Sequence, residues 1–146
     1  MNKVFITLLM ITTSSFVLAE NANWLETQKE SHIFINKDSI TIDKENPNLK
    51  TVTISVNIPS MQDRKANPTK TKLTNPYPLS YLTKFTINCQ DKTAKMGEQH
   101  LHENFFGQGK VLEQADADPH AQFIPLEGPD AKQIWEVTCS PEQSSS

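Results

Sequence analysis

The chain has 146 residues and a formal net charge of −3 at pH 7, from 14 basic and 17 acidic residues. A chain of this length is expected to fold as one domain with a real hydrophobic core. Its only arginine is Arg64. The mild acidity argues against nucleic acid as a partner, because such binding requires clustered lysine and arginine side chains that neutralise phosphates.

Residues 1–19 have the order of a secretory signal peptide. Lys3 supplies the positive start, residues 4–11 form an apolar run, and Val17 and Ala19 suit a cleavage site before Glu20. The alternative interpretation is a buried N-terminal strand or helix. No segment reaches the ~20 apolar residues of a membrane helix, and no cysteine follows the run to carry a lipid. We therefore predict an exported protein without an integral membrane span, located in the periplasm or secreted to the cell surface.

The first half of the exported chain is predicted to form strands. Residues 24–28 are a short first strand, and residues 33–43 form a tight hairpin or a bent strand around the turn-forming sequence NKDS. Alternation is clearest in LKTVTISVNIP, which predicts a strand with one buried face. The residues predicted on that face are Val52, Ile54, Val56 and Ile58.

The second half alternates again and ends in a helix. Residues 79–89 and 93–102 are predicted as antiparallel partners, and Gly107 and Gly109 allow a turn or bulge before a short last strand. The segment EGPDAKQIWEVTCSP is predicted as the one helix, with Pro129 and Asp130 in its first turn and Pro141 ending it. Its apolar stripe, whose tryptophan is predicted as core, consists of Ala131, Ile134, Trp135, Thr138 and Cys139. Residues 141–146 are predicted as a flexible tail.

Cys89 and Cys139 are the only two cysteines in the chain. Cys89 ends the apolar side of a predicted strand, and Cys139 lies on the apolar side of the predicted helix. In an exported protein two thiols most simply form one disulfide, and two free buried thiols are the alternative. The disulfide would fasten the helix onto the sheet, which makes the expected fold class α+β.

His100, His102 and Glu98 alternate along a predicted strand and therefore point to one face. Together they could bind zinc weakly, with His120 as a fourth ligand. The preferred interpretation is a solvated polar strand face, because half-exposed antiparallel strands carry such residues routinely. No metal site, cofactor or catalytic residue is predicted.

Four sequence blocks carry a resemblance to a known family: IFINKDSITID, FTINCQDKTAKM, FFGQGKVLE and AKQIWEVTC. In this order and spacing they resemble the surface-adhesin protein E family of Gram-negative bacteria, over about residues 24–139. The resemblance implies a single antiparallel sheet of about six strands, with a C-terminal helix packed on one face and tied by a Cys89–Cys139 disulfide. The family domain would span residues 20–140.

The resemblance also implies a non-enzymatic binding module that contacts host matrix proteins or cell-envelope proteins. The alternative is a periplasmic protein that binds or inhibits an envelope enzyme. Host-matrix binding in the family is tied to a basic stretch before the first cysteine, where this chain has only Lys84. A monomer and a homodimer are both left open. The candidate partner-binding residues are Arg64, Lys65, Lys70, Lys72 and Tyr77 in a polar loop, with Phe105 and Phe106 beside Gly107.

Overall fold

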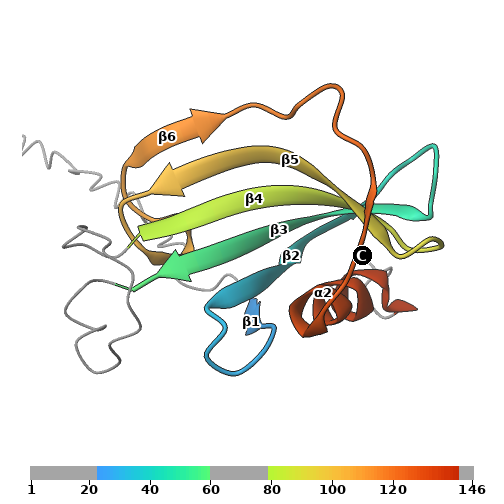
Figure 1. The fold of residues 1–146 in the computed structure, drawn as a ribbon, viewed down its shortest axis with the longest axis horizontal. Helices are drawn as coiled ribbons and strands as arrows, with labels where there is room; N and C mark the ends of the chain where they lie inside the picture. The colour runs from blue at the N-terminus through green and yellow to red at the C-terminus, as the bar shows by residue number, and fades with distance from the viewer. Residues whose placement is uncertain (1–22, 60–78, 142–146) are drawn as a thin grey trace, which may run out of the picture.

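The computed structural model describes residues 23–59 and 79–141, which form an antiparallel sheet with a helix on one face (Figure 1). The predicted signal peptide and the tail after Pro141 lie outside the described residues. The strands are β1 Trp24–Glu26, β2 Ile33–Ile42, β3 Leu49–Ile58, β4 Leu79–Asn88, β5 Thr93–His102, β6 Val111–Ala115 and β7 Ile124–Pro125. A 3-10 turn, η1 (Phe105–Gly107), precedes β6, and helix α2 (Pro129–Cys139) follows β7.

The sheet is a meander in which β1 to β6 pair with their neighbours in chain order, while the two-residue β7 pairs with β5. This arrangement confirms the predicted α+β fold with six strands, and β7 is an unpredicted addition. Within residues 23–59 and 79–141, none of the helices combines the length and the hydropathy needed to cross a bilayer.

The sequence NKDS bends β2 without ending it. The pairing of β2 with β3 shifts register between Asn36 and Thr41. The Ser39 hydroxyl donates to the Asn36 carbonyl at 2.7 Å and accepts from the Thr53 N–H at 2.8 Å. Turn-forming side chains thus satisfy the backbone groups that the irregularity frees. Of the two predicted alternatives, the bent strand is correct.

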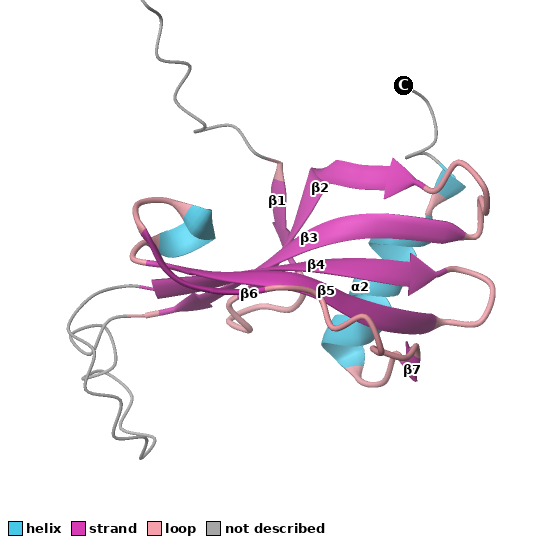
Figure 2. Cartoon of the chain, turned by 90° about the horizontal axis from the view of Figure 1, so that it is seen from above, coloured by secondary structure: helices cyan, strands magenta, loops and turns pink. Residues whose placement is uncertain are grey.

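Helix α2 lies against one face of the sheet (Figure 2), and the main core is between them. Its buried sheet residues are Ile35, Val52, Ile54, Ile87 and Ala94, and α2 packs Ile134, Trp135, Val137 and Cys139 against them. Cys89 and Cys139 form a disulfide with a Cα–Cα distance of 5.6 Å. The predicted disulfide is therefore confirmed, as is the inward position of Ile134, Trp135 and Cys139, while Val137 packs on the core without having been predicted there.

The buried face changes sides along β3. Val56, predicted as buried, is 36% exposed, while its neighbours Ser55 and Asn57 on the opposite face are buried. The prediction for Val56 is wrong because this end of the strand is covered by η1, which lies at the far end of the sheet from α2 (Figure 2). Asn57 Oδ1 accepts from the Phe106 N–H at 3.1 Å, which fixes η1 against β3.

The η1 turn depends on Ser80 and Gly107. The Ser80 hydroxyl donates to the Asn104 carbonyl at 2.6 Å and accepts from the Gly107 N–H at 2.9 Å. Gly107 has a φ of +70°, and a Cβ at this position would overlap the Leu82 side chain. Glycine is therefore required here both by backbone conformation and by space, which agrees with the predicted turn.

Candidate functional site

The predicted partner-binding residues fall into two groups. Arg64, Lys65, Lys70, Lys72 and Tyr77 lie outside the described residues, so their role stays a prediction. The second group is Phe105 and Phe106, both half-buried in η1.

Phe106 is packed into an aromatic cluster instead of projecting into solvent. Its ring centroid lies 5.3 Å from that of Trp24 and 4.9 Å from that of Phe34, the latter in an edge-to-face arrangement. Phe105 touches the cluster less closely, with its centroid 6.5 Å from that of Phe106. Such aromatic pairs stabilise a fold beyond the area they bury. The cluster therefore holds η1 on the sheet, and Phe105 is the more available of the two rings.

A pocket beside α2 brings together residues that the sequence did not group. Its volume is about 450 Å³. It is formed where the β4–β5 turn and the segment between β7 and α2 meet the first turns of the helix. The side chains around it are Lys92, Leu126, Pro129, Lys132, Trp135 and Glu136.

Trp135 forms the aromatic wall of this pocket. Its indole N–H donates to the Cys89 carbonyl at 3.2 Å, so the polar edge of the ring is satisfied inside the protein. The Lys92 ammonium lies 4.4 Å from the ring centroid, a cation–π contact. Trp135 therefore packs against the core, as predicted, and also presents ring surface and an associated positive charge to the pocket.

The Lys92 backbone is held in place from two sides. Its φ is +54°, which is uncommon for a residue with a Cβ and indicates a conformation imposed by the turn. Its carbonyl accepts from the Leu126 N–H at 3.0 Å, which links the β4–β5 turn to the segment entering α2. The backbone from which the Lys92 side chain extends is therefore fixed beside the pocket.

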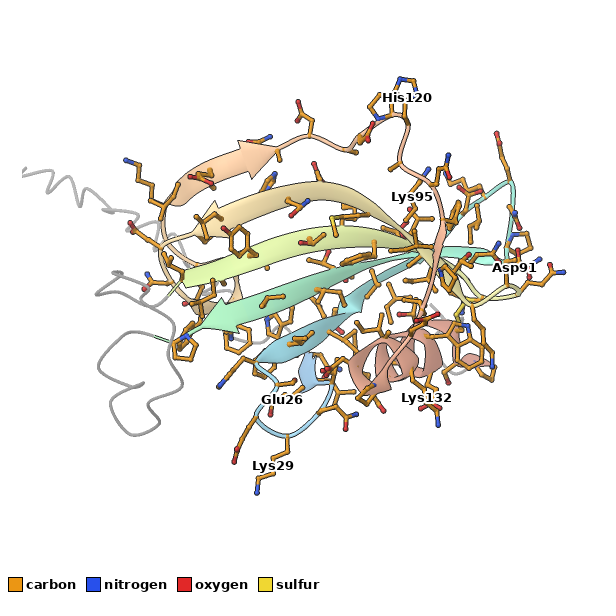
Figure 3. The ribbon with its side chains drawn as sticks, in the orientation of Figure 1. Glu26, Lys29, Asp91, Lys95, His120 and Lys132 are labelled. Atoms are coloured by element: carbon orange, nitrogen blue, oxygen red, sulfur yellow. A yellow bond between two sulfur atoms is a disulfide. The ribbon has the colours of Figure 1, made fainter. Side chains whose placement is uncertain are left out.

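Lys132 contributes a second cation from the exposed side of α2, where Figure 3 labels it. Its ammonium lies 3.7 Å from a Glu136 carboxylate oxygen, and its side chain is 75% exposed. An exposed i,i+4 pair of this kind contributes little energy and exchanges readily with a partner's charges. Near β7, Lys95 makes a second lysine–aromatic contact, with its ammonium 5.4 Å from the Phe123 ring centroid.

The arrangement favours an acidic group attached to an apolar body. Lys92 and Lys132 supply two ammonium groups against the one carboxylate of Glu136, so the charge around the pocket is positive, and Trp135 and Leu126 supply apolar surface. Shallow pockets that combine aromatic surface with a few oriented charges are typical of binding sites for peptides and small ligands. The sequence pattern assigned Trp135 to the core alone. It had no local signal for the pocket, because Lys92 reaches it only through the β4–β5 pairing.

The two histidines of β5 also differ from expectation. His102 is only 8% exposed, so the interpretation of this strand face as solvated is wrong at that position. The reason is that η1 is held over this end of the sheet by Ser80, the neighbour of His102 on β4. His120, considered as a fourth zinc ligand, lies on the loop after β6 and points away from the sheet (Figure 3).

Comparison with known proteins gives one family and one fold. The sequence profile of the family described as Surface-adhesin protein E matches residues 23–140. No curated protein sequence matches the chain significantly.

Similar folds are found in crystal structures of Haemophilus influenzae protein E. One aligns with a TM-score of 0.59 at 13% identity, covering 86% of this chain and 90% of that chain. A second crystal form gives a TM-score of 0.58 at 15% identity, covering 82% and 88%. At this identity the structures support the shared fold alone, and the profile match over nearly all described residues decides the family. The chain belongs to the surface-adhesin protein E family.

Proposed function

We propose that this chain is an exported, non-enzymatic binding module of the surface-adhesin type, displayed at the cell surface. The observation that carries this proposal is the family match over residues 23–140. The signal-peptide pattern of residues 1–19 supports export. The proposed partner is a protein of the host matrix. The alternative, a protein that binds or inhibits an envelope enzyme, predicts a location in the periplasm instead.

We assign the partner contact to the pocket at Trp135. In this chain the segment before Cys89 carries little positive charge, whereas Lys92 and Lys132 lie beyond it in sequence and meet at the pocket. Charge complementarity then favours an acidic segment of the partner, whose apolar side chains pack on Trp135 and Leu126. The loop residues Arg64, Lys65, Lys70, Lys72 and Tyr77, together with Phe105, are proposed as additional contacts.

Surface labelling of intact cells tests the location. A membrane-impermeant amine reagent is expected to label the protein on intact cells as strongly as after permeabilisation of the outer membrane, because the described domain carries many exposed lysines, among them Lys29, Lys44 and Lys110. A periplasmic marker protein, labelled only after permeabilisation, is the control. If this protein behaves like the marker, the periplasmic envelope-binding alternative replaces the surface role.

Charge reversal tests the pocket. Lys92→Glu combined with Lys132→Glu is expected to weaken binding to an immobilised basement-membrane extract at least about tenfold, because each attraction to an acidic partner becomes a repulsion. Binding of the unaltered protein should also fall as salt rises. Surface plasmon resonance measures both effects.

Lys29→Glu combined with Lys110→Glu is the matched control, since it makes the same change in net charge at two exposed lysines outside the pocket; Lys110 directly precedes β6, at the end of the sheet away from α2 (Figure 1). Circular dichroism checks that both variants are folded. Equal binding by the pocket variant and the control would remove the pocket from the proposal and leave the surface role standing.

A further inference from the structure

The sheet face opposite α2 carries a second row of polar side chains along β5. Glu98, His100 and His102 alternate, so they share this face, and the register pairs His100 with Leu82 and His102 with Ser80. This row is separate from the pocket at Trp135, so a ligand bound to it would be independent of the proposed function.

Three ring nitrogens in this row are buried without a hydrogen-bond partner: Nε2 of His100 and both Nδ1 and Nε2 of His102. A neutral imidazole carries one donor and one acceptor, so neither capacity of His102 is used inside the protein. The hydroxyl of Ser80, its neighbour on β4, is engaged with η1. Buried polar groups are nearly always paired, because an unpaired one has lost its hydrogen bonds to water without replacement. Two such imidazoles on one face indicate a ligand that binds nitrogen.

The two rings are placed so that one ion could bind both. Their centroids are 6.2 Å apart, with planes inclined by 51°. A metal ion lies about 2.0–2.1 Å from an imidazole nitrogen, hence roughly 3 Å from the ring centre, so two rings on one ion have centres at most about 6 Å apart, and binding would draw these two rings closer together. A cavity of about 160 Å³ opens beside His100, lined by Thr53, Leu82, Lys84 and Glu98. The cavity lining includes His100 and not His102, so the His102 ring has to turn toward the cavity for both nitrogens to reach one ion.

The two charges that line the cavity balance each other, so they do not repel a cation. The Glu98 carboxylate lines the cavity and accepts from the Lys84 ammonium at 2.6 Å. The hydrogen bond and charge of Lys84 lower the pKa of this carboxyl, so Glu98 stays anionic and balances the lysine. Cys89 and Cys139 are joined in the disulfide and offer no thiolate.

The described part of the chain contains no cluster of three or more His, Cys, Asp or Glu side chains arranged to hold a metal. An ion at this site would therefore have two protein ligands, and water would fill its remaining positions. Imidazole ligands suit zinc and copper, whereas magnesium and calcium prefer oxygen. We propose that His100 and His102 together bind one divalent transition-metal ion of the zinc and copper class through their ring nitrogens.

Calorimetric titration of the untagged protein with zinc chloride or copper chloride tests this site. One equivalent is expected to bind with micromolar affinity, copper more tightly than zinc and magnesium not at all. His100→Gln and His102→Gln should each weaken binding at least tenfold. His120→Gln, which alters an exposed histidine on a loop, should leave it unchanged.

A spectroscopic measurement on the unaltered protein covers the case in which a histidine variant fails to fold. Zinc is expected to shift the ring-nitrogen resonances of His100 and His102 in a nitrogen–proton correlation spectrum, and to leave those of His32 and His120 in place. Absence of binding heat at micromolar metal overturns the proposal. So does a shift confined to His32 or His120, or full binding retained by folded His100→Gln and His102→Gln variants.

Discussion

Replacing Cys89 and Cys139 together by alanine is expected to lower the free energy of unfolding by about 4 kcal/mol. The two cysteines are separated by 50 positions in the sequence, so the disulfide closes a long loop and removes much of the conformational freedom of the unfolded chain. The disulfide holds the C-terminal end of α2. This helix packs only one side against the sheet, and Thr138 is its one fully buried residue. Urea unfolding followed by circular dichroism measures the loss.

The reduced form of the unaltered protein is the control for this experiment. Because reduction breaks the same crosslink without changing a side chain, its unfolding midpoint should fall close to that of the double variant. A double variant as stable as the oxidised protein would mean that packing of Ile134 and Val137 alone holds α2 on the sheet. The role assigned to the disulfide would then be wrong.

The helix and its crosslink could be predicted because their signals are local. Pro129 and Asp130 mark the start of α2, the apolar stripe fixes its inward side, and two cysteines in an exported chain leave one pairing. The observed helix, Pro129–Cys139, lies within the predicted segment and begins at the predicted first turn. For β5 the predicted range 93–102 is the observed one.

The face change along β3 could not be predicted from alternation. Alternation with a period of two shows which side chains share a face of the strand. It does not show what covers that face at each point. Ser55 and Asn57 are buried because η1, from a distant part of the chain, lies over them and because Asn57 accepts hydrogen bonds from Ser55 and from Phe106. The burial of His102 and the unpartnered state of its nitrogens have the same tertiary origin.

The pocket at Trp135 could not be predicted for a related reason. An apolar stripe predicts that a tryptophan packs inward. How much of its large ring stays exposed depends on how far the neighbouring segments extend over it. Here β7 and Leu126 reach the edge of β5 and leave the ring open between Lys92 and Lys132. Only the three-dimensional structure shows that these two lysines flank one aromatic surface.

Ile54→Ala is expected to destabilise the protein by about 3 kcal/mol, whereas Val56→Ala, two positions further along the same face of β3, should cost less than about 1 kcal/mol. Ile54 is 2% exposed and pairs with Ile35, which is fully buried. Val56 is 36% exposed and pairs with Tyr81, itself 37% exposed, so removing its methyl groups leaves no sealed cavity.

Urea unfolding of both oxidised variants measures the difference, and the shared strand, face and disulfide make Val56→Ala a matched control. The contrast locates the end of the core, since the loss at each site reports how fully α2 and its neighbours enclose that side chain. Equal losses at the two positions would mean that close packing on the α2 side continues past Ile54. The conclusion that Val56 lies beyond the core under α2, where η1 covers the opposite face of β3, would then be wrong.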